Sequence, residues 1–279
     1  MKRGTRKLGL PAFELKRTVP RKLFLDIETA PLEAYVWALW KQNVGLSQIT
    51  HDFTILSFSA SWEGEDKVYH FNTGGKGKAK VRDDRYLCEV LWHLLDHADI
   101  VVVQNGKKFD IPKINARMLD YSMPPYSPIK IVDTMLIAKK HFGFTSNKLQ
   151  YMTEKYCVTK KRKHEKFPGF ELWVEMLKDN PEAWAECKLY NDDDVTSMKE
   201  LYYKISPWME GHPNVAVYSD SERPQCPKCG SHQLVKRGFS YTQTGKYQRY
   251  QCAEEKCGGW ARSRYTLNTV GKRKALLSN

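Results

Sequence analysis

The sequence has no hydrophobic run long enough to cross a membrane. A membrane-spanning helix needs about 18 consecutive, mainly apolar residues, and no stretch of these 279 residues approaches that length. The basic segment 1–22 also lacks the apolar stretch of a secretory signal. We therefore expect a cytoplasmic protein without a membrane partner. Its 41% hydrophobic residues suffice for a packed core.

Acidic residues are in short supply. The chain has 45 Lys and Arg against 32 Asp and Glu, a formal net charge of +13. Segments 1–22, 139–166 and 223–279 carry net charges of +7, +7 and +10, which leaves −11 for the remainder. Basic flanks around an acidic body are typical of an enzyme that binds metal centrally and a polyanion at its periphery. The expected partner is therefore a nucleic acid, although each basic stretch alone could be ordinary solvated surface.

Cysteine is scarce too, and four of the seven cysteines gather near the end of the sequence. They form a CPKC pair and a CAEEKC pair: Cys226, Cys229, Cys252 and Cys257. In a cytosolic protein, two such pairs indicate one structural Zn²⁺ held by four thiolates rather than disulfides. The second pair is wider than the usual CxxC spacing, and His232 is an alternative ligand. The remaining cysteines, Cys88, Cys157 and Cys187, are predicted to be buried thiols.

Hydrophobic periodicity predicts an α/β fold. Strands are expected at 22–28, 53–62, 67–72, 99–105 and 130–132, and helices at 83–97, 111–119, 133–140, 148–156 and 181–205. This order is that of a ribonuclease H-like mixed sheet: an antiparallel meander is extended by parallel strands, with helices on both faces. The four predicted parts are a basic arm (1–20), a catalytic domain (21–207), a linker (208–224) and a zinc ribbon with a basic tail (225–279).

Acidic residues recur on elements that this fold could bring to one point. Asp26 and Glu28 are two residues apart on a strand, so both side chains leave the same face. Asp110 follows the buried strand 99–105, where it could instead cap a helix. Together with Asp194, these residues make four acids, which would repel one another at one site unless divalent cations bind there. Phosphodiester hydrolysis is the usual reaction of such sites.

The helix 181–205 carries the last motif. Tyr190 and Asp194 are four residues apart and share one helical face, whereas Asp192 and Asp193 are predicted to face solvent. On its own, Tyr190 could be a half-buried aromatic residue with a hydrated hydroxyl group.

The motifs LDIET, NGKKFD and YNDDDV resemble, in this order, the three exonuclease motifs of the DEDD superfamily, in the subclass with tyrosine in the third motif. Their surroundings, including DTMLIAKK and SNKLQYM, resemble exonucleases related to the proofreading domain of family-B DNA polymerases. Many of these are encoded by bacteriophages, which would place the protein in the host cytoplasm. The resemblance covers about residues 20–208.

The resemblance implies a role for each matching residue. Asp26, Glu28, Asp110 and Asp194 match the acids that bind two Mg²⁺ or Mn²⁺ ions. Tyr190 matches the tyrosine that orients or deprotonates the attacking water, and a phenol with a pKa near 10 favours the orienting role. The expected substrate-binding residues are Asn105, Phe109, Lys148, Arg237 and Arg249. The implied activity is 3′–5′ exonucleolytic hydrolysis that releases nucleoside 5′-monophosphates.

Several alternatives remain open at this stage. Single-stranded DNA is the preferred substrate, with an exoribonuclease or a structure-specific nuclease of the same fold as rivals. A non-catalytic nucleic-acid- or partner-binding protein is a rival of another class, and the intact acidic motifs argue against it. No polymerase domain is recognisable, so proofreading would need a polymerase or another replication or recombination partner in trans.

The cysteine-rich segment resembles the zinc ribbons of transposases and other nucleic-acid-binding proteins. Its basic residues alternate with aromatic ones between 236 and 265. Basic side chains can bind phosphate while aromatic rings stack on bases, or the rings can form the small core of the ribbon. We expect both uses, with one or two rings exposed.

Overall fold

The computed structural model describes residues 18–41, 43–161 and 164–278. Most of the predicted basic arm, residues 1–17, lies outside the described residues. The chain forms two compact units. The first contains Arg21–Met135 and Thr145–Glu200, and the second contains Leu136–Phe144 and Leu201–Asn279.

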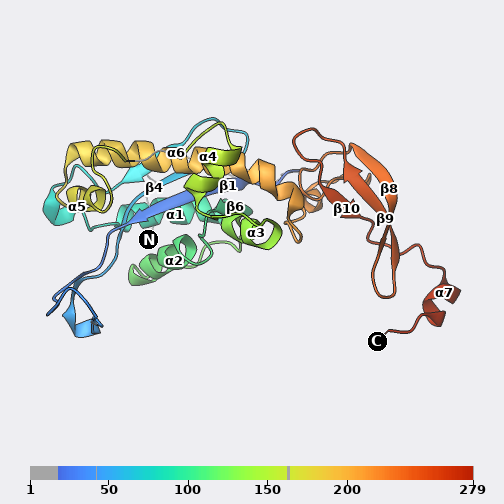
Figure 1. Ribbon diagram of the computed structural model, residues 1–279, viewed down its shortest axis with the longest axis horizontal. Helices are drawn as coiled ribbons and strands as arrows, with labels where there is room; N and C mark the ends of the chain where they lie inside the picture. The colour runs from blue at the N-terminus through green and yellow to red at the C-terminus, as the bar shows by residue number, and fades with distance from the viewer. Residues whose placement is uncertain (1–17, 42, 162–163, 279) are drawn as a thin grey trace, which may run out of the picture. The chain divides into compact units, whose positions relative to one another are not determined.

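The first unit is built on a five-stranded sheet with the strand order β5-β4-β1-β6-β7 (Figure 1). The strands are β1 (Lys22–Thr29), β4 (Ile55–Trp62), β5 (Tyr69–Asn72), β6 (Ile100–Val103) and β7 (Lys130–Asp133). Strands β1, β4 and β5 form an antiparallel meander, and β6 and β7 extend it in parallel. The predicted ribonuclease H-like mixed sheet is thereby confirmed.

Helices cover both faces of this sheet (Figure 1). In chain order they are α1 (Arg85–Asp96), α2 (Asp110–Asp120), α3 (Thr134–His141), α4 (Leu149–Tyr156), α5 (Glu171–Leu177) and α6 (Pro181–Ile205). Helix α1 buries its apolar stripe, which includes Leu87, Leu91 and Leu94, in a core shared with α2 and the sheet. Helix α6 crosses the opposite face. No helix among the described residues has the length and apolar character needed to span a membrane.

Strand β1 separates apolar side chains from acidic ones because successive residues of a strand point to opposite faces. Leu23, Leu25 and Ile27 join the apolar core with α1 and α2. Asp26 and Glu28 therefore point to the face that α6 covers. The alternation of β1 delivers both carboxylates to one side of the sheet.

Three serines of β4 continue this polar face. Ser59 pairs with Asp26 and Ser57 with Glu28 across the antiparallel ladder. All three serines are buried because α6 lies over them. The contacts are Ser57 Oγ to Cys187 Sγ at 3.3 Å, Ser59 Oγ to Asp192 Oδ1 at 2.6 Å, and Lys199 Nζ to Ser61 Oγ at 3.3 Å. Helix α6 thus docks on the sheet partly through hydrogen bonds.

Some elements were not predicted from the sequence. A hairpin of β2 (Glu33–Ala34) and β3 (Ile49–His51) interrupts the path from β1 to β4, and α5 follows the basic segment 139–166. Strands of two or three residues are too short to show alternation, and α5 has only seven residues. Short 3₁₀ helices occur at η1 (Leu46–Gln48), η2 (Lys78–Lys80), η3 (Ser206–Trp208) and η4 (Val215–Tyr218).

The second unit contains a three-stranded sheet with the order β10-β9-β8. Its elements are β8 (Leu234–Tyr241), β9 (Lys246–Cys252), β10 (Trp260–Arg262) and the short helix α7 (Val270–Ala275). The segment 208–224 that precedes this sheet buries His212 and Val215. His212 Nε2 lies 2.7 Å from Tyr202 Oη, and the Val215 amide donates to the Pro227 carbonyl at 2.8 Å.

Candidate active site and cysteine cluster

Three carboxylates converge between β1 and α6. Asp26, Glu28 and Asp194 each offer one oxygen, and these atoms lie within 4.8 Å of one another. Tyr190 precedes Asp194 by one helical turn and is half-buried. The fold therefore brings together residues from the first strand of the first unit and from helix α6.

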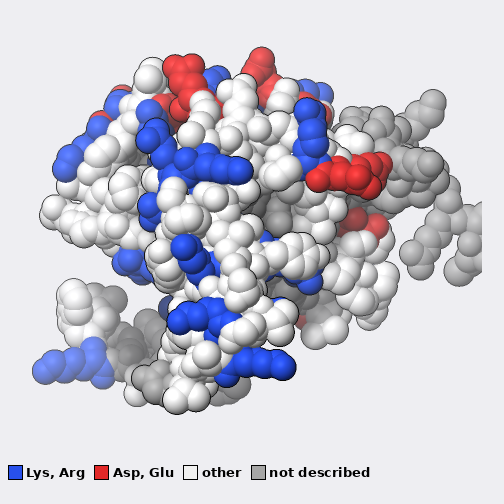
Figure 2. All heavy atoms as spheres, turned by 90° about the vertical axis from the view of Figure 1, so that its right-hand side faces the viewer, with Lys and Arg blue, Asp and Glu red and all other residues white. Residues whose placement is uncertain are grey.

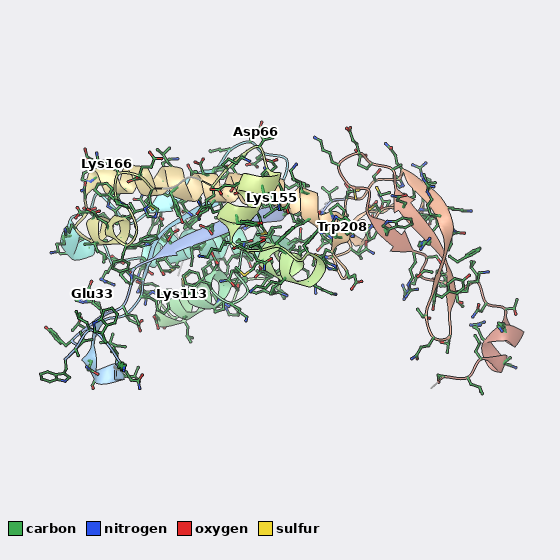
Figure 3. The ribbon with its side chains drawn as sticks, in the orientation of Figure 1. Glu33, Asp66, Lys113, Lys155, Lys166 and Trp208 are labelled. Atoms are coloured by element: carbon green, nitrogen blue, oxygen red, sulfur yellow. The ribbon has the colours of Figure 1, made fainter. Side chains whose placement is uncertain are left out.

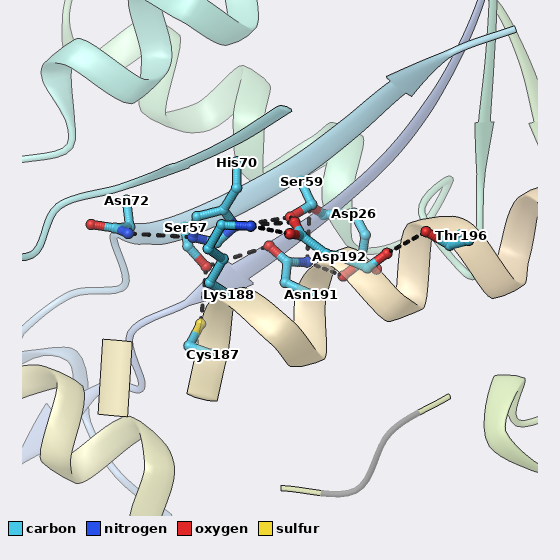
Figure 4. A network of polar contacts seen from close by, with 10 residues as sticks. All are labelled: Asp26, Ser57, Ser59, His70, Asn72, Cys187, Lys188, Asn191, Asp192 and Thr196. Carbon is cyan, nitrogen blue, oxygen red and sulfur yellow. Dashed lines mark hydrogen bonds and ion pairs between the residues drawn. The ribbon is translucent and has the colours of Figure 1, made fainter. Parts of the chain in front are cut away.

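Asp26 is held in place by a side chain of α6. Asn191 Nδ2 donates to Asp26 Oδ2 at 2.7 Å, and Ser57 Oγ donates to Asn191 Oδ1 at 3.5 Å (Figure 4). Asn191 is fully buried, so this amide can adopt few other orientations. It fixes both the direction of the Asp26 carboxylate and the contact of α6 with β1.

Asp192 belongs to the same polar contact network, which corrects the prediction that it faces solvent. Its Oδ1 accepts from Ser59 at 2.6 Å and lies 3.6 Å from His70 Nδ1 (Figure 4). Lys188 forms an ion pair with its other oxygen. The helical period places Asp192 over β4, where a buried serine row supplies partners.

The aromatic rings of Trp173 and His164 connect Glu28 with Tyr190. Trp173 Nε1, on α5, donates to Glu28 Oε2 at 3.1 Å. The His164 ring packs edge-on against both Trp173 and Tyr190, with centroid distances of 5.5 and 5.3 Å. The unpredicted helix α5 thus supplies a hydrogen bond to a catalytic-motif acid.

Lys161 supplies positive charge inside the acidic cluster. Its Nζ donates to Asp194 Oδ2 at 2.5 Å and lies 4.2 Å from the centroid of the Tyr190 ring. The other oxygen of Asp194, Oδ1, is buried and has no hydrogen-bond partner among the described residues. A buried, unpartnered carboxylate oxygen is unfavourable unless a cation binds it.

Burial and the nearby negative charges both raise the pKa values of the clustered acids. Burial raises the pKa of Glu28 to about 8, and the charge of Asp194 adds to this effect. Burial also raises the pKa of Asp194 to about 6, against the opposing influence of Lys161. The pKa of Asp26 is raised well above its ordinary value, first by burial and then by the charges of Asp194 and Asp110. Without a cation, the cluster retains protons near neutral pH.

Asp110 lies beside the three converging acids but outside their group. Its Oδ1 accepts from the Ile27 amide at 3.1 Å, and burial raises its pKa to about 7. Strand β1 pairs with β6 over Lys22–Phe24, which leaves the Ile27 amide available to this carboxylate. Phe109 holds the N-cap position of α2 and Asp110 is its first helical residue, so the alternative role of Asp110 as an N-cap does not apply.

A buried aspartate shapes the loop that precedes Asp110. Asp133 Oδ1 accepts from the Asn105 amide at 3.0 Å, and its Oδ2 accepts from the Lys107 amide at 3.1 Å. Asn105 adopts a φ of 63°, and a Cβ on Gly106 would lie 2.5 Å from Val103 Cβ. Asp133 Oδ1 also accepts from the Met135 amide at 3.0 Å, at the start of α3. The loop is therefore held tightly.

The predicted substrate-binding residues of this unit occupy different settings. Phe109 is exposed at the end of the loop, and Asn105 is half-buried within it. Lys148 is exposed immediately before α4. Lys113 Nζ lies between two rings, 5.1 Å from the centroid of Phe109 and 3.7 Å from that of Phe53. This aromatic–cation–aromatic contact next to Asp110 was not predicted.

The donor set of the acidic cluster fits hard divalent cations. Carboxylate oxygens are the preferred ligands of Mg²⁺ and Mn²⁺. The three grouped acids are close enough to share an ion, and the free Oδ1 of Asp194 gives a ligand atom without a competing hydrogen bond.

The four C-terminal cysteines form a second cluster. Their Sγ atoms lie within 4.8 Å of one another, with 3.8 Å between Cys226 and Cys257 and 3.6 Å between Cys229 and Cys252. A disulfide requires about 2.05 Å, whereas four sulfurs at about 2.3 Å from a tetrahedral Zn²⁺ lie roughly 3.8 Å apart. The cluster is therefore compatible with a zinc ribbon.

Two tight turns bring these sulfurs together. Gly230 follows the first pair with a φ of 78°, and Gly258 follows the second with a φ of 60°. The wider CAEEKC spacing therefore does not prevent the cluster. His232 lies outside it, since its Nδ1 is 3.2 Å from the Pro224 carbonyl.

The sheet of the ribbon carries cations stacked on aromatic rings. Arg249 lies 4.8 Å from the centroid of Trp260, and Arg262 lies 4.0 Å from that of Tyr247. Arg249 Nε also donates to the Arg237 carbonyl at 2.8 Å. More rings are exposed than the one or two predicted: Phe239, Tyr241, Trp260 and Tyr265.

Comparisons with known proteins bear on the first unit. A family model described as RNase_H superfamily matches residues 23–206. No curated protein matches the chain in sequence. Among solved structures, the chain is similar to the family B DNA polymerase from the hyperthermophilic archaeon Pyrobaculum calidifontis, with a TM-score of 0.51 and 18% identity. The match covers 68% of this chain and 25% of that chain, so our sequence spans about a quarter of the polymerase.

At 18% identity, the likeness to the polymerase shows a shared fold alone. The family match is stronger evidence because it spans more than half of the chain and includes every predicted acid of the site. The family match confirms the predicted ribonuclease H-like class, and it supports a nuclease activity and a nucleic-acid substrate. The chain belongs to the RNase H superfamily.

Proposed function

We propose that this protein is a metal-dependent 3′–5′ exonuclease of the DEDD superfamily, in the subclass with tyrosine in the third motif. Its preferred substrate in this proposal is single-stranded DNA. The observation that carries the proposal is the convergence of Asp26, Glu28 and Asp194 within 4.8 Å, with Tyr190 one helical turn from Asp194.

Asp26, Glu28, Asp110 and Asp194 would hold two Mg²⁺ or Mn²⁺ ions. When bound, such ions lower the pKa of water and stabilise the negative charge that develops on a phosphate undergoing in-line displacement. Asn191 orients Asp26 through its 2.7 Å hydrogen bond. Lys161 balances the charge of Asp194 and would have to shift its ion pair when a cation takes that carboxylate.

Tyr190 acts through its hydroxyl group as an orienting residue. Burial raises the pKa of Tyr190 above its ordinary value, and the charge of Asp194 adds to the effect. The phenol therefore stays protonated at neutral pH and is a poor general base. It can hold an attacking water by a hydrogen bond while the carboxylate cluster activates it.

The exposed ring of Phe109 would receive the terminal nucleotides. Lys113 sits between Phe109 and Phe53, so a cation and two rings lie together next to the acid of the second motif. Single-stranded nucleic acids are commonly bound by such combinations, in which rings stack on bases and cations contact phosphates. Phe53 and Lys113 are therefore added to the proposed substrate-binding residues.

The cysteine cluster would hold one structural Zn²⁺, and the ribbon would bind the strand. Residues 223–279 contain twelve Lys and Arg against two acids. Figure 2 shows Lys and Arg side chains scattered from the top to the bottom of one face, with uncharged surface between them and acidic groups near the top. Arg249 and Arg262 occupy directly paired positions on β9 and β10. Like charges at such positions repel each other, and a phosphate beside them would relieve this repulsion.

Incubation with end-labelled single-stranded DNA and RNA of one sequence tests the activity. The expected result is stepwise shortening from the 3′ end in Mg²⁺ or Mn²⁺, release of nucleoside 5′-monophosphates, and no cleavage in EDTA. Asp66→Asn, at an exposed acid outside the cluster (Figure 3), is the control for ligand variants. Cleavage of a strand with a blocked 3′ end would contradict the exonuclease, and faster RNA cleavage would favour an exoribonuclease.

Binding at several salt concentrations tests the ribbon. Arg249→Ala with Arg262→Ala should weaken strand binding and flatten its logarithmic salt dependence by about 0.7 for each lost phosphate contact. Arg223→Ala removes an exposed charge outside the sheet and serves as the control. An unchanged slope in the double variant would mean that this face of the ribbon does not contact nucleic acid.

A further inference from the structure

The hairpin between β1 and β4 presents an unusual apolar surface. Its large hydrophobic side chains are exposed, including Trp37 (98%), Leu46 (88%) and Trp40 (82%). The exposed residues that form this surface, called the hairpin tip, are Tyr35, Trp37, Leu39, Trp40, Val44 and Leu46. Soluble proteins seldom expose so many large apolar residues together unless the surface binds a partner.

The hairpin tip belongs to an ordered element. The Tyr35 amide donates to the Gln48 carbonyl at 2.9 Å, and Gln48 Nε2 returns a hydrogen bond to the Tyr35 carbonyl at 2.8 Å. Gln48 Oε1 also accepts from the Gly45 amide at 2.8 Å. These bonds link the two arms of the loop at Tyr35, Gly45 and Gln48, so the segment that carries the exposed side chains is closed at its base.

The base of the hairpin is tied to the rest of the first unit. Arg82 pairs with Glu33 and donates to the Asp52 carbonyl at 3.0 Å. Figure 3 shows Glu33 at the root of the hairpin, which projects away from the sheet. The tip therefore stands clear of the core that it could otherwise join.

Charge distinguishes this surface from the nucleic-acid-binding surfaces proposed above. Residues 35–48 contain one lysine and no arginine or acid. In the ribbon, by contrast, Trp260 and Tyr247 each carry a stacked arginine, and Phe109 has Lys113 beside it. Nucleic-acid affinity depends strongly on cations that contact phosphates, so the hairpin tip suits an apolar protein surface instead.

We infer that the hairpin tip docks against the hairpin tip of a second copy of this chain. In a twofold interface each patch meets an identical patch, so a charged surface repels itself and an uncharged apolar one does not. The chain has a net charge of +13, and the tip is a neutral exception. Its three aromatic side chains could bury roughly 450–750 Å² of surface. With the aliphatic residues, the buried area approaches the value of about 800 Å² per partner that is typical of a stable interface.

Light scattering coupled to size-exclusion chromatography of the full, zinc-loaded chain tests this inference. The wild-type protein should be a dimer at micromolar concentration. Trp37→Ser with Trp40→Ser should be a monomer, with the dimer Kd raised at least about 30-fold. Tyr265→Ser, at an equally exposed ring of the ribbon, should leave the dimer intact. A far-UV circular dichroism spectrum like that of the wild-type protein would show that the hairpin variant folds.

Two further measurements keep the inference falsifiable. The dimer should persist at 1 M NaCl and after nuclease treatment, since it is apolar and needs no nucleic acid. A photo-crosslinking residue at Leu39 should give a covalent dimer. A monomeric wild-type protein, a dimer that dissolves in salt, or a dimer retained by the double tryptophan variant would each overturn the proposed docking. Nuclease activity is unaffected by these outcomes, so they do not bear on the proposed function.

Discussion

The two clusters that could hold metal differ in how the chain makes them. The acids Asp26 and Asp194 come from the first strand and the last helix of the sheet unit, so the whole fold must form before they meet. The four cysteines come from two tight turns linked by a short sheet. The first cluster depends on the fold around it, whereas we expect the second, with zinc bound, to stabilise a module with little core of its own.

Ligand chemistry sharpens this difference. Carboxylates favour hard, exchangeable cations, and thiolates favour tightly held zinc. The acids are buried and mutually repelling, and Lys161 offsets part of their charge. An acidic cluster of this kind can persist without metal in a folded protein. The comparison therefore predicts that variants of the two clusters fail in different ways.

The largest expected effect concerns the cysteines. Cys226→Ser with Cys252→Ser should remove the single zinc and unfold the ribbon, because structural zinc sites contribute about 10–16 kcal/mol of apparent binding energy. Cleavage of a short strand by the sheet unit should continue. Elemental analysis after dialysis and a cleavage assay on the same sample provide the readouts. Cys88→Ser is the control, and zinc retained by the double variant would exclude this ligand set.

The next largest effect concerns the acids. Asp194→Asn should lower the cleavage rate by about 10⁴-fold or more, as removal of one member of a catalytic unit does. Its zinc content and strand binding should be unchanged, which is the reverse of the cysteine variant. Gel shifts and cleavage assays measure the two properties, with Asp66→Asn as the control. Near-wild-type cleavage would end the assignment of Asp194 as a metal ligand.

Tyr190→Phe is expected to slow single-turnover cleavage by about 10²–10⁴-fold. Phenylalanine keeps the ring contacts with His164 and Lys161 and loses only the hydroxyl group. The melting temperature should therefore stay close to that of the wild type. Tyr126→Phe, which removes a hydroxyl bonded to Asn115, is the control. A normal rate would leave Tyr190 with a packing role alone.

Asn191→Ala tests the amide that positions Asp26. Loss of its 2.7 Å hydrogen bond should weaken Mg²⁺ or Mn²⁺ binding about 10–100-fold, as is typical for groups that orient metal ligands. Activity should recover at high metal concentration, unlike that of Asp194→Asn. Metal titration of the cleavage rate gives this readout, with Thr196→Ala as a control on the same helix. A loss that metal does not rescue would point to a folding defect.

The smallest effect is a difference in pH response. Burial raises the pKa of Glu28 to about 8 and that of Asp110 to about 7. Between pH 6.5 and 8, the unfolded chain has released these protons and the metal-free fold still binds them, so stability falls as pH rises. His70, whose pKa burial lowers to about 4, acts in the opposite direction mainly below about pH 7, where the unfolded chain still binds this proton.

Melting temperatures in EDTA between pH 6.5 and 8.5 test this response. Glu28→Gln should reduce the slope, and Mg²⁺ should stabilise the protein most at the higher pH. Zinc should behave in the opposite way, because acid protonates thiolates and releases the ion. A metal-free protein that gains stability toward pH 8 would contradict the raised pKa values.

Much of the fold and part of the site could be predicted from the sequence. Alternation placed Asp26 and Glu28 on one face, and Pro181 marked the start of α6. Asn191 was missed although a signal existed, since the spacing of Cys187, Asn191, Asp194 and Met198 follows the helical period and places them on one face of the helix. Lys161 could not be identified from the sequence, because the segment between α4 and α5 has no hydrophobic periodicity. Its position depends on contacts with Asp194 that only the folded chain creates.

The serine row on β4 determines how precisely helix α6 is positioned on the sheet. An apolar helix face can slide or rotate slightly on a sheet at small cost, since apolar contacts are not directional. Hydrogen bonds from Ser59 and Asn191 weaken steeply when their geometry changes. They therefore fix the rotation of α6 about its own axis as well as its distance from the sheet. Small polar side chains bury less apolar surface than large apolar ones, but they fix the orientation of the helix. The orientation of α6 in turn determines where Tyr190 and Asp194 point.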